Sequence, residues 1–480
     1  MEPAIPGVTW YGHELLKLFP EAAGCVAADE RFEGVTLDSR QPVAGGIFIA
    51  LRGRSVDAHT RIPEAFAGGV ALAVVEQAVW RHAPVDWQQY RCIPVTSPLK
   101  ALGELARWHR ERFRLPVIAV VGSAGKTTTK EFIAAVLQER FRVLKTPGNE
   151  NNQLGVPLTL LHLHSEHEVA VLELGTNSFG EIARLCQLAQ PTHGVVTALG
   201  EEHLEFLGSF AGVVQEETAL VRFLRERAGV VVLPADEPVL LRQSGELTFG
   251  LSPGASVWVE VSRVEEGYPV VRVHYGGRVF LCRLRVPGTA GVRAAAAAAA
   301  VAWALGMDMD TVARALAQVS VPPSVHGYGR MALVELPEGI RVLNDTYNAN
   351  PLSMRVALET LQLLPCQGKR WAVLGDMREL GQAAEAAHRR VLEQACAVAD
   401  VVCVLGQMLG ALAGEYPGVH AFQTHEELAA HLHRWVQPGD VVMLKGSRAL
   451  AMERVLQLWQ QYTAERSHAL SSGAVDLEDL

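Results

Sequence analysis

The sequence lacks the cysteine pattern of a disulfide-bonded or zinc-binding protein. Its 480 residues include seven cysteines, and no two of them have the C-x-x-C spacing. The odd number and the wide spacing favour reduced thiols. It also lacks a basic leader with a long apolar segment at its start. The longest apolar run, residues 294–305, is shorter than a membrane span. These absences predict a cytoplasmic protein that is not embedded in a membrane.

An excess of positive charge is also missing. Lys and Arg total 43 against 52 Asp and Glu, which gives a formal net charge of −9 and argues against binding to nucleic acid. A hydrophobic content of 49% and a charged content of 20% indicate a globular chain. Any bound phosphate must therefore be met by local Lys or Arg side chains and Mg²⁺, not by a basic surface.

A short glycine-rich loop is the most informative feature that is present. Apolar residues 117–121 lead into Gly122-Ser123-Ala124-Gly125-Lys126-Thr127-Thr128, and a helix is expected to begin after Lys126. Backbone N–H groups at such a turn form a cradle for phosphate, Lys126 can reach the outer phosphates, and Thr127 can bind Mg²⁺. The first glycine of the longer standard motif is replaced by Val120. Because a strand is predicted before the loop and a helix after it, we interpret the loop as a nucleoside triphosphate-binding site and not as a plain strand–helix turn.

The order of apolar runs predicts an α/β protein of three domains. Strands alternate with helices in the central part of the chain, which predicts a mainly parallel sheet covered on both faces, and an antiparallel hairpin is expected at Tyr275-Gly276-Gly277. Pro322-Pro323 has the composition of a linker. The predicted segments are an N-terminal αβ domain at 1–113, a central domain at 114–323, a C-terminal αβ domain at 324–466 and an acidic tail, expected to be disordered, at 467–480.

Polar residues follow two predicted strands of the central domain. Glu173 is the next-to-last residue of the apolar run 169–174, which precedes Gly175-Thr176-Asn177, and His203 follows the strand predicted at 194–197. A carboxylate at a strand end beside a phosphate loop is where a Mg²⁺ ligand is expected. An isolated Glu or His is more often structural. Since parallel strands end at one sheet edge, we expect Lys126, Glu173 and His203 to lie together.

Two further loops carry candidate binding groups. The segment that holds Asn149, Asn151 and Asn152 offers amides that could grip a substrate carboxylate or peptide, although turn formation alone would also explain them. In the third region Asp345 follows a strand and could accept hydrogen bonds from ribose hydroxyls. Lys445-Gly446-Ser447-Arg448 ends a strand and opens a helix, a second potential anion site.

Together these motifs resemble the Mur ligase family across residues 34–460. The resemblance rests on Asp38-Ser39-Arg40, Asp57-Ala58-His59, the loop 122–129, Gly148-Asn149-x-Asn151-Asn152-x-x-Gly155-Val156-Pro157, Leu172-Glu173-Leu174-Gly175, His203-Leu204-Glu205, Gly329-Arg330, Asp345-Thr346-Tyr347-Asn348-Ala349-Asn350-Pro351, Val373-Leu374-Gly375-Asp376-Met377-x-Glu379-Leu380-Gly381 and Lys445-Gly446-Ser447-Arg448. The motifs at 345–351 and 375–381 are specific to the branch that adds D-alanyl-D-alanine to UDP-N-acetylmuramoyl-tripeptide. The D-N-P-R box of the diaminopimelate-adding branch is absent.

The resemblance implies an ADP-forming amide ligase of peptidoglycan precursor synthesis that uses ATP and Mg²⁺. A monomer is expected. The tripeptide carboxylate would attack the γ-phosphate of ATP, and the amine of D-alanyl-D-alanine would attack the resulting acyl phosphate. Such a reaction depends mainly on positioning and on neutralisation of charge. The first domain would bind the UDP-sugar, the central domain ATP, and the third would complete the ligase site.

The family also implies roles for individual residues. Lys126 would stabilise the transferring phosphoryl group, Thr127 and Glu173 would hold one Mg²⁺, and His203 would hold the other. The implied ATP-binding set is Gly122, Ser123, Ala124, Gly125, Lys126, Thr127, Thr128, Arg330, Asp345, Asn348 and Asn350. The implied substrate-binding set is Ser39 and Arg40 near the UDP end, with Asn149, Asn151, Asn152, Thr176, Asn177, Lys445, Ser447 and Arg448.

The chain departs from the family pattern at three positions. The D-G-H of the family's first domain is Asp57-Ala58-His59 here, a mild change. The His-Asn-x-x-Asn motif near the adenine falls on Ala290-Gly291-Val292-Arg293-Ala294, which carries no side-chain amide. The carbamylated lysine of the family aligns with Glu217, or with Glu216 if the register slips by one residue. Glu217 would supply directly the carboxylate that a carbamate provides, and oxygen ligands are those that Mg²⁺ prefers. A solvated helix face that carries both glutamates is the alternative.

The sequence is also compatible with two other functions. A degenerate ligase that binds nucleotide as a regulator would explain the missing amides. A ligase of the same fold with another acceptor, such as a folate-polyglutamate or alternative peptide ligase, would keep the same phosphate loop.

Overall fold

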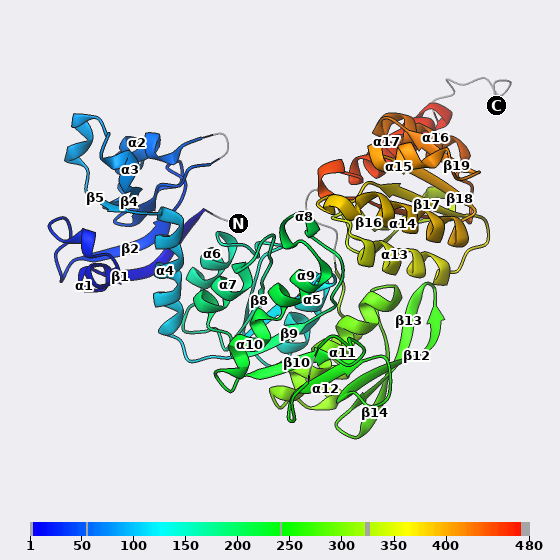
Figure 1. Cartoon of the computed structure of the whole chain (residues 1–480), viewed down its shortest axis with the longest axis horizontal. Helices are drawn as coiled ribbons and strands as arrows, with labels where there is room; N and C mark the ends of the chain where they lie inside the picture. Colours follow the sequence, from blue (N-terminus) through cyan, green and yellow to red (C-terminus); the bar gives the residue numbers. More distant parts are fainter. Residues whose placement is uncertain (1–2, 54–55, 241, 322–326, 472–480) are drawn as a thin grey trace. The chain divides into compact units, whose positions relative to one another are not determined.

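The computed structural model describes residues 3–53, 56–240, 242–321 and 327–471, and within these ranges the chain forms three β-sheets with flanking helices (Figure 1). The α/β class predicted from the sequence is confirmed. Two compact units can be distinguished: Met1–Ala119 with Phe141–Gly175 and Glu181–His193, and Val120–Arg140 with Thr176–Gly180 and Gly194–Leu480. The described residues include no helix with the length and apolar character needed to cross a membrane.

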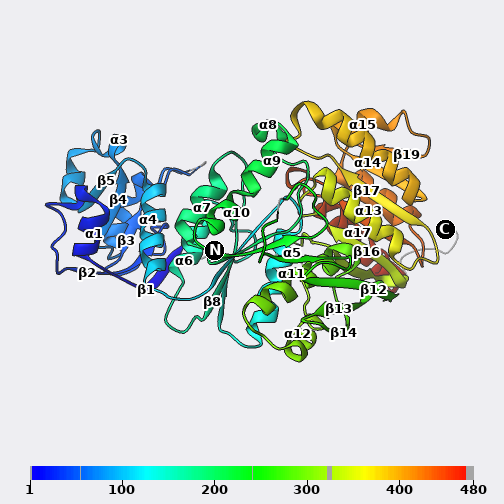
Figure 2. The same cartoon turned by 60° about the horizontal axis from the view of Figure 1, so that its bottom comes forward.

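The first sheet has the strand order β1-β2-β3-β4-β5, with β1 antiparallel to β2 and the others parallel. Helix α4 (Pro98–Glu111) packs against β3 and β4 (Figure 2), and the Ser97 side chain caps it by accepting from Lys100 N. The strands are β1 (Ala4–Tyr11), β2 (Arg31–Thr36), β3 (Ile47–Ile49), β4 (Leu72–Glu76) and β5 (Cys92–Val95), and the other helices are α1 (Gly12–Leu18), α2 (Ile62–Ala67) and α3 (Gln77–Trp80).

The second sheet has the order β14-β13-β12-β11-β10-β9-β6-β8-β7. The predicted hairpin is confirmed, since β13 and β14 pair antiparallel with Tyr275 opposite Arg278. The strands are β6 (Val117–Val121), β7 (Val143–Lys145), β8 (Val169–Glu173), β9 (His193–Val196), β10 (Val230–Pro234), β11 (Leu247–Gly250), β12 (Val257–Glu265), β13 (Tyr268–Tyr275) and β14 (Arg278–Arg283).

The helices that follow these strands include α5, which begins directly after the glycine-rich loop. The alanine run 294–300 lies inside α11 and is buried, and its small side chains let α11 pack on α5. The helices are α5 (Lys126–Gln138), α6 (Gly155–Leu161), α7 (Glu181–Ala189), α8 (Leu204–Leu207), α9 (Phe210–Glu217), α10 (Ala219–Arg225), α11 (Gly288–Ala304) and α12 (Met309–Leu316).

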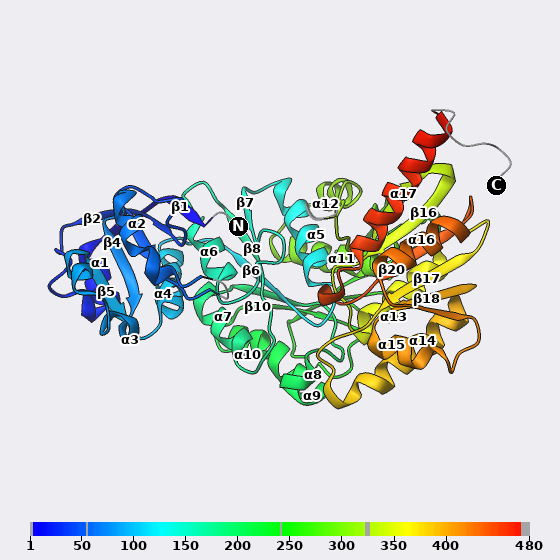
Figure 3. The same cartoon turned by 90° about the horizontal axis from the view of Figure 1, so that it is seen from above.

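The third sheet has the order β15-β16-β20-β17-β18-β19, in which only the β15–β16 pair of the described strands is antiparallel. Figure 3 shows α16 and α17 on one face of this sheet and α13 and α14 on the other. The strands are β15 (Ala332–Leu336), β16 (Ile340–Asp345), β17 (Arg370–Gly375), β18 (Val401–Leu405), β19 (Val419–Phe422) and β20 (Val441–Lys445), and the helices are α13 (Pro351–Leu363), α14 (Ala384–Val398), α15 (Gln407–Ala413), α16 (His425–Trp435) and α17 (Glu453–Ser471).

The domain limits predicted at 113/114 and 323/324 stay predictions. Pro322 and Pro323, the expected linker, lie outside the described residues. Helix α17 continues to Ser471, beyond the predicted limit at residue 466, and residues 472–480 also lie outside the described residues.

Candidate active site

The glycine-rich loop lies between β6 and α5, as the sequence predicts. Gly122 and Gly125 have φ values of +128° and +83°, which only glycine adopts readily. A Cβ atom at Gly122 would also lie 2.3 Å from the Thr197 hydroxyl oxygen. That hydroxyl contacts the carbonyl oxygens of Val121 at 3.1 Å and Ala124 at 2.7 Å. Thr197, the residue that follows β9, therefore holds the loop in place through its hydroxyl group.

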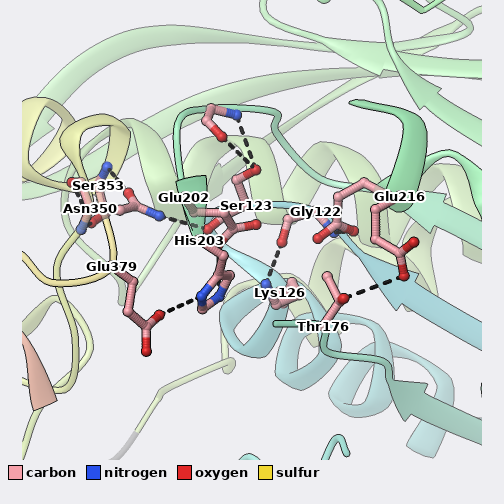
Figure 4. A network of polar contacts seen from close by, with 12 residues as sticks. Gly122, Ser123, Lys126, Thr176, Glu202, His203, Glu216, Asn350, Ser353 and Glu379 are labelled. Carbon is pink, nitrogen blue, oxygen red and sulfur yellow. Dashed lines mark hydrogen bonds and ion pairs between the residues drawn. The ribbon is translucent and has the colours of Figure 1, made fainter. Parts of the chain in front are cut away.

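Ser123 secures the other side of the loop. Its backbone N–H donates to Ala198 O at 2.7 Å, and its hydroxyl donates to Gly200 O at 3.0 Å. Asn350, at the start of α13, donates from Nδ2 to the carbonyl oxygen of Ser123 at 3.0 Å (Figure 4). The Oδ1 atom of Asn350 accepts from Ser353 N at 2.8 Å and caps that helix. One amide thus joins the start of α13 to the phosphate loop.

The ammonium group of Lys126 lies over the loop and donates to the carbonyl oxygen of Gly122 (Figure 4). Thr127 and Thr128 form the first turn of α5, and both are buried. The positive end of the helix dipole and the lysine therefore face the same loop. This arrangement has the polarity that an anionic phosphate requires.

The Glu217 carboxylate lies directly beside this loop and is fully buried. Its Oε2 atom accepts from Gly122 N at 2.6 Å. Burial raises the pKa of Glu217 to about 8; Lys126 and the Gly122 N–H oppose the shift, and the neighbouring Glu202 carboxylate adds to it. Among the described residues, the Oε1 atoms of Glu217 and Glu202 have no hydrogen-bond partner. Two buried carboxylates with unsatisfied oxygens call for a proton or a cation.

The adjacent Glu216 points elsewhere. Its Oε1 atom accepts from the Thr176 hydroxyl at 3.3 Å, and its Oε2 atom accepts from Gly180 N at 2.7 Å. Glu216 therefore holds the loop 176–180, whereas Glu217 meets the phosphate loop. Glu217 is thus the glutamate that lies beside the phosphate loop, and both glutamates are buried, so neither lies on a solvated helix face.

His203 lies just before α8 with a φ of +48°. Its Nδ1 atom contacts Glu379 Oε2 at 2.5 Å, and its Nε2 atom lies 3.8 Å from Glu202 Oε2 (Figure 4). No group of three or more His, Cys, Asp or Glu side chains suited to a metal occurs in the described part of the chain. Mg²⁺ commonly takes only one or two carboxylates and completes its shell with water and substrate phosphates.

Glu173 is buried at the end of β8 in the first compact unit. Its backbone N–H donates to the Thr146 hydroxyl at 3.0 Å, and its Oε1 atom accepts from Asn151 Nδ2 at 2.8 Å. Asn152 instead accepts through Oδ1 from Leu154 N and Gly155 N. Of the predicted amides, Asn151 therefore orients the acidic residue and Asn152 forms a turn.

Ser39 and Arg40, the residues predicted to lie near the UDP end of the substrate, follow strand β2. The Ser39 hydroxyl donates to Glu64 Oε2 at 3.1 Å. The Arg40 guanidinium forms a 2.7 Å ion pair with Asp38, and its side chain is 80% exposed. Ser39 is therefore held in place, and Arg40 stands in solvent.

In the third sheet, Asp345 is paired with a lysine. Its Oδ2 atom accepts from Lys445 Nζ at 2.5 Å, and its Oδ1 atom accepts from Met331 N at 3.0 Å. Lys445 also donates to Asn348 O at 2.8 Å. The predicted ribose acceptor and the predicted anion-binding lysine thus meet at the ends of neighbouring strands β16 and β20.

Two arginines of this region stack on tyrosines. The Arg330 guanidinium lies 3.6 Å from the ring centre of Tyr347, and that of Arg448 lies 4.7 Å from the ring centre of Tyr328. Ser447 is buried, and its hydroxyl has no partner among the described residues. The stacking on tyrosine rings gives both guanidinium groups a defined orientation.

Sequence reasoning missed Glu202 and Glu379. Glu202 adjoins His203 in a segment already singled out, so its position next to a candidate ligand was the available signal. Glu379 lies in the motif 375–381, but its contact with His203 spans 176 positions of the sequence. No local pattern could have paired these two residues.

Comparison with known proteins agrees with this geometry. The Mur ligase middle domain matches residues 120–302, and the Mur ligase glutamate ligase domain matches residues 329–448. A relative from Bacillus subtilis (strain 168), named UDP-N-acetylmuramoyl-tripeptide–D-alanyl-D-alanine ligase, is 32% identical and aligns with 88% of this chain and 92% of its own length. The chain belongs to the Mur ligase family.

Other members of the Mur ligase family support the same relationship. The protein of the same name from Escherichia coli (strain K12) is 34% identical and covers 90% of this chain and 95% of its own length. Among solved structures, MurF from Acinetobacter baumannii has a TM-score of 0.84 at 29% identity and covers 95% of this chain and 100% of its own. MurF ligase from Thermotoga maritima, in complex with ADP, has a TM-score of 0.79 at 29% identity, with coverages of 90% and 98%.

Proposed function

We propose that this Mur ligase adds D-alanyl-D-alanine to UDP-N-acetylmuramoyl-tripeptide with conversion of ATP to ADP and phosphate, a step of peptidoglycan precursor synthesis. The observation that carries the proposal is the phosphate loop with Lys126 and the buried Glu217 beside it. The names and the near full-length coverage of the relatives from Bacillus subtilis and Escherichia coli support the choice of substrates. The ADP in the Thermotoga maritima relative supports the choice of nucleotide.

The reaction proceeds in two displacements. A carboxylate oxygen of the tripeptide attacks the γ-phosphorus of ATP, so that an acyl phosphate forms and ADP leaves. The free amine of D-alanyl-D-alanine then attacks the acyl carbon, loses a proton, and expels inorganic phosphate as the amide forms. Neither step needs a covalent bond to the protein, so the protein contributes positioning and charge neutralisation.

Lys126 and the loop residues 122–128 bind the phosphates of ATP in this proposal. The lysine ammonium lies at the loop already, and it offsets negative charge that develops as the phosphoryl group transfers. The backbone N–H groups at the start of α5 would supply further donors. Arg330, Asp345, Asn348 and Asn350 stay predicted nucleotide residues.

The residues beside the loop suit Mg²⁺. Glu217 and Glu202 bring unsatisfied carboxylate oxygens to one place, and His203 Nε2 lies near the same Glu202. Bound there, Mg²⁺ would supply positive charge to the phosphate oxygens. Glu217 would hold it through oxygen, and Thr127, Glu173 and His203 stay predicted ligands.

The remaining substrate contacts also stay predictions. Ser39 and Arg40 are proposed for the UDP end of the sugar nucleotide. Asn149, Asn151, Asn152, Thr176, Asn177, Lys445, Ser447 and Arg448 are proposed for the peptide and the acceptor. Action as a monomer likewise stays a prediction.

Phosphate release measured with and without D-alanyl-D-alanine tests the proposed function. With ATP, Mg²⁺ and UDP-N-acetylmuramoyl-tripeptide present, release should require the dipeptide. A nucleotide-binding regulator would release no phosphate, and a ligase with another acceptor would respond to a different amine. Either of those results would contradict the proposal.

Weak discrimination between ATP and GTP is expected, because the segment at the start of α11 carries no side-chain amide. Gly291 approaches the chain so closely that a Cβ atom there would lie 2.6 Å from Val286 O. Arg293 in the same segment is paired with Asp236 at 2.5 Å. Selectivity for one base depends on hydrogen bonds from side chains to the polar groups of that base. The measurement is kcat/KM for both nucleotides.

A large preference for ATP would contradict this expectation and would mean that another residue reads the base. Asn350 is an unsuitable substitute, because its Oδ1 caps α13 and its Nδ2 donates to Ser123 O. Asn348 would then be the residue to replace, although its Oδ1 accepts from Arg448 N at 3.3 Å.

A further inference from the structure

The loop Gly375–Gly381 is built as a rigid element between β17 and α14. The Asp376 carboxylate accepts from Met408 N at 3.0 Å and Leu409 N at 2.9 Å, which ties the loop to the start of α15. The backbone N–H of Met377 donates at 2.9 Å to Nε2 of His388, a fully buried residue. Two separate anchors therefore fix the first half of the loop.

The second half of the loop lies against the segment that carries His203. The backbone N–H of Glu205 donates to Glu379 O at 3.1 Å. Gly381 has a φ of +52°, and a Cβ atom there would lie 3.5 Å from Glu205 Cα. Glu379 itself has a φ of +63°, a conformation uncommon for a non-glycine residue. Such a conformation persists only where the surroundings fix it.

The Glu379 side chain reaches His203 from this loop. Its Oε2 atom lies 2.5 Å from His203 Nδ1 (Figure 4). Since an ionised carboxylate only accepts hydrogen bonds, the contact places a proton on Nδ1. In the neutral ring the lone pair is then on Nε2, the nitrogen that lies 3.8 Å from Glu202 Oε2.

We propose that Glu379 is a positioning residue that fixes the tautomer and the ring orientation of His203, so that Nε2 is presented to the cation held beside Glu202 and Glu217. The role rests on the proposed function, in which His203 is a metal ligand. Carboxylates that hold the second nitrogen of a ligating histidine do this generally in metal sites. Glu379 comes from the third sheet's loops, so His203 is oriented when that loop is in contact with residues 203–205.

A second ion pair provides a control that distinguishes orientation of His203 from mere attachment of the two segments to each other. Arg390 on α14 pairs with Glu201 Oε2 at 2.8 Å and so also joins a C-terminal helix to the segment beside His203. Both side chains are more than a third exposed, as is that of Glu379. Exposed pairs contribute little to stability. If Glu379 only held the segments together, loss of Arg390 would have the same consequence as loss of Glu379.

The test compares Glu379→Ala, Glu379→Gln and Arg390→Gln in the full chain. Nitrogen-15 NMR of histidine-labelled, metal-free protein reports the tautomer, with the His203 signals assigned from a His203→Gln spectrum. Wild type and Arg390→Gln should show a proton on Nδ1 of His203, and Glu379→Ala should lose that preference. An unchanged His203 tautomer in Glu379→Ala would overturn the proposal.

Binding of Mn²⁺ in the presence of a non-hydrolysable ATP analogue supplies a second readout. Affinity should fall about 10-fold or more in Glu379→Ala, less in Glu379→Gln if the amide oxygen still accepts from Nδ1, and not at all in Arg390→Gln. In a His203→Ala background, Glu379→Ala should have no further effect. Equal losses in Arg390→Gln, or full additivity with His203→Ala, would contradict the proposal.

The two proposals can fail separately. Absence of phosphate release by the wild-type protein with D-alanyl-D-alanine would reject the proposed function and leave the tautomer measurement intact. Normal release with an unchanged tautomer in Glu379→Ala would reject only the role of Glu379.

Discussion

Replacing Lys126 by alanine is expected to lower kcat by about 100-fold or more while the fold is retained. The ammonium group lies at the carbonyl of Gly122 and faces the loop where the phosphates are proposed to bind. Preorganised charges that act on a developing anion typically have effects of this size. Alanine is a good helix former, so the first turn of α5 should tolerate it. Steady-state phosphate release and thermal unfolding are the measurements.

The matched control is Lys100→Ala, which removes an ammonium group from an exposed position on α4. Its rate should equal that of the wild-type protein. If Lys126→Ala kept half of the wild-type rate, the glycine-rich loop could not be the site of phosphoryl transfer.

Replacing Glu217 by glutamine should weaken turnover and the dependence on Mg²⁺ together. The variant keeps the size of the side chain and removes the charge that meets the cation beside Gly122. Loss of a residue that only orients a metal ligand typically costs 10- to 100-fold, so loss of a direct ligand should lower the rate by about 10-fold or more. Rates measured across a Mg²⁺ titration supply the test. Full activity at limiting Mg²⁺ would rule the role out.

The unfolding of metal-free Glu217→Gln distinguishes a lost ligand from a damaged fold. Because burial raises the pKa of Glu217 from its usual 4.5 to about 8, the folded wild-type protein holds a proton that the unfolded chain releases between these values. Wild-type stability should therefore fall as the pH rises through this range. The glutamine variant should lack this loss and be the more stable protein at alkaline pH.

The effect of bicarbonate on activity is a second test of the role of Glu217. Wild-type activity should not depend on bicarbonate, because Glu217 already carries a carboxylate. Glu217→Lys should be inactive without bicarbonate and regain activity with it, since carbon dioxide added to the amine restores an anionic oxygen ligand. A bicarbonate requirement in the wild-type protein would contradict the proposal that Glu217 stands in for a carbamate.

The buried parallel strands could be predicted from the sequence almost to the residue. Strand β6 spans Val117–Val121, the apolar run from which it was predicted, because a strand covered on both faces is a continuous apolar run. Strand β1 (Ala4–Tyr11) had no such signal. Pro6 and Gly7 interrupt it, and its pairing with β2 shifts between Ile5 and Thr9.

Candidate site residues could be predicted where residues close in the sequence form a recognisable chemical motif. The phosphate loop was predicted from its motif, and Glu217 from its alignment with the carbamylated lysine of the Mur ligase family. Only the packing of α9 turns Glu216 to Gly180 and Glu217 to Gly122. Side-chain amides were harder to interpret, because Asn152 and Asn350 serve as caps or turns, a use that the sequence does not distinguish from binding. Contacts between distant segments had no local signal at all.

The fate of an isotopic label tests the central claim most directly. UDP-N-acetylmuramoyl-tripeptide labelled with ¹⁸O in both oxygens of the reacting carboxylate is incubated with the protein, ATP, Mg²⁺ and D-alanyl-D-alanine. Mass spectrometry of the products should find one ¹⁸O atom in inorganic phosphate and one in the new amide carbonyl, because the oxygen that attacks phosphorus leaves with it. Phosphate released without ¹⁸O would contradict an acyl-phosphate ligase.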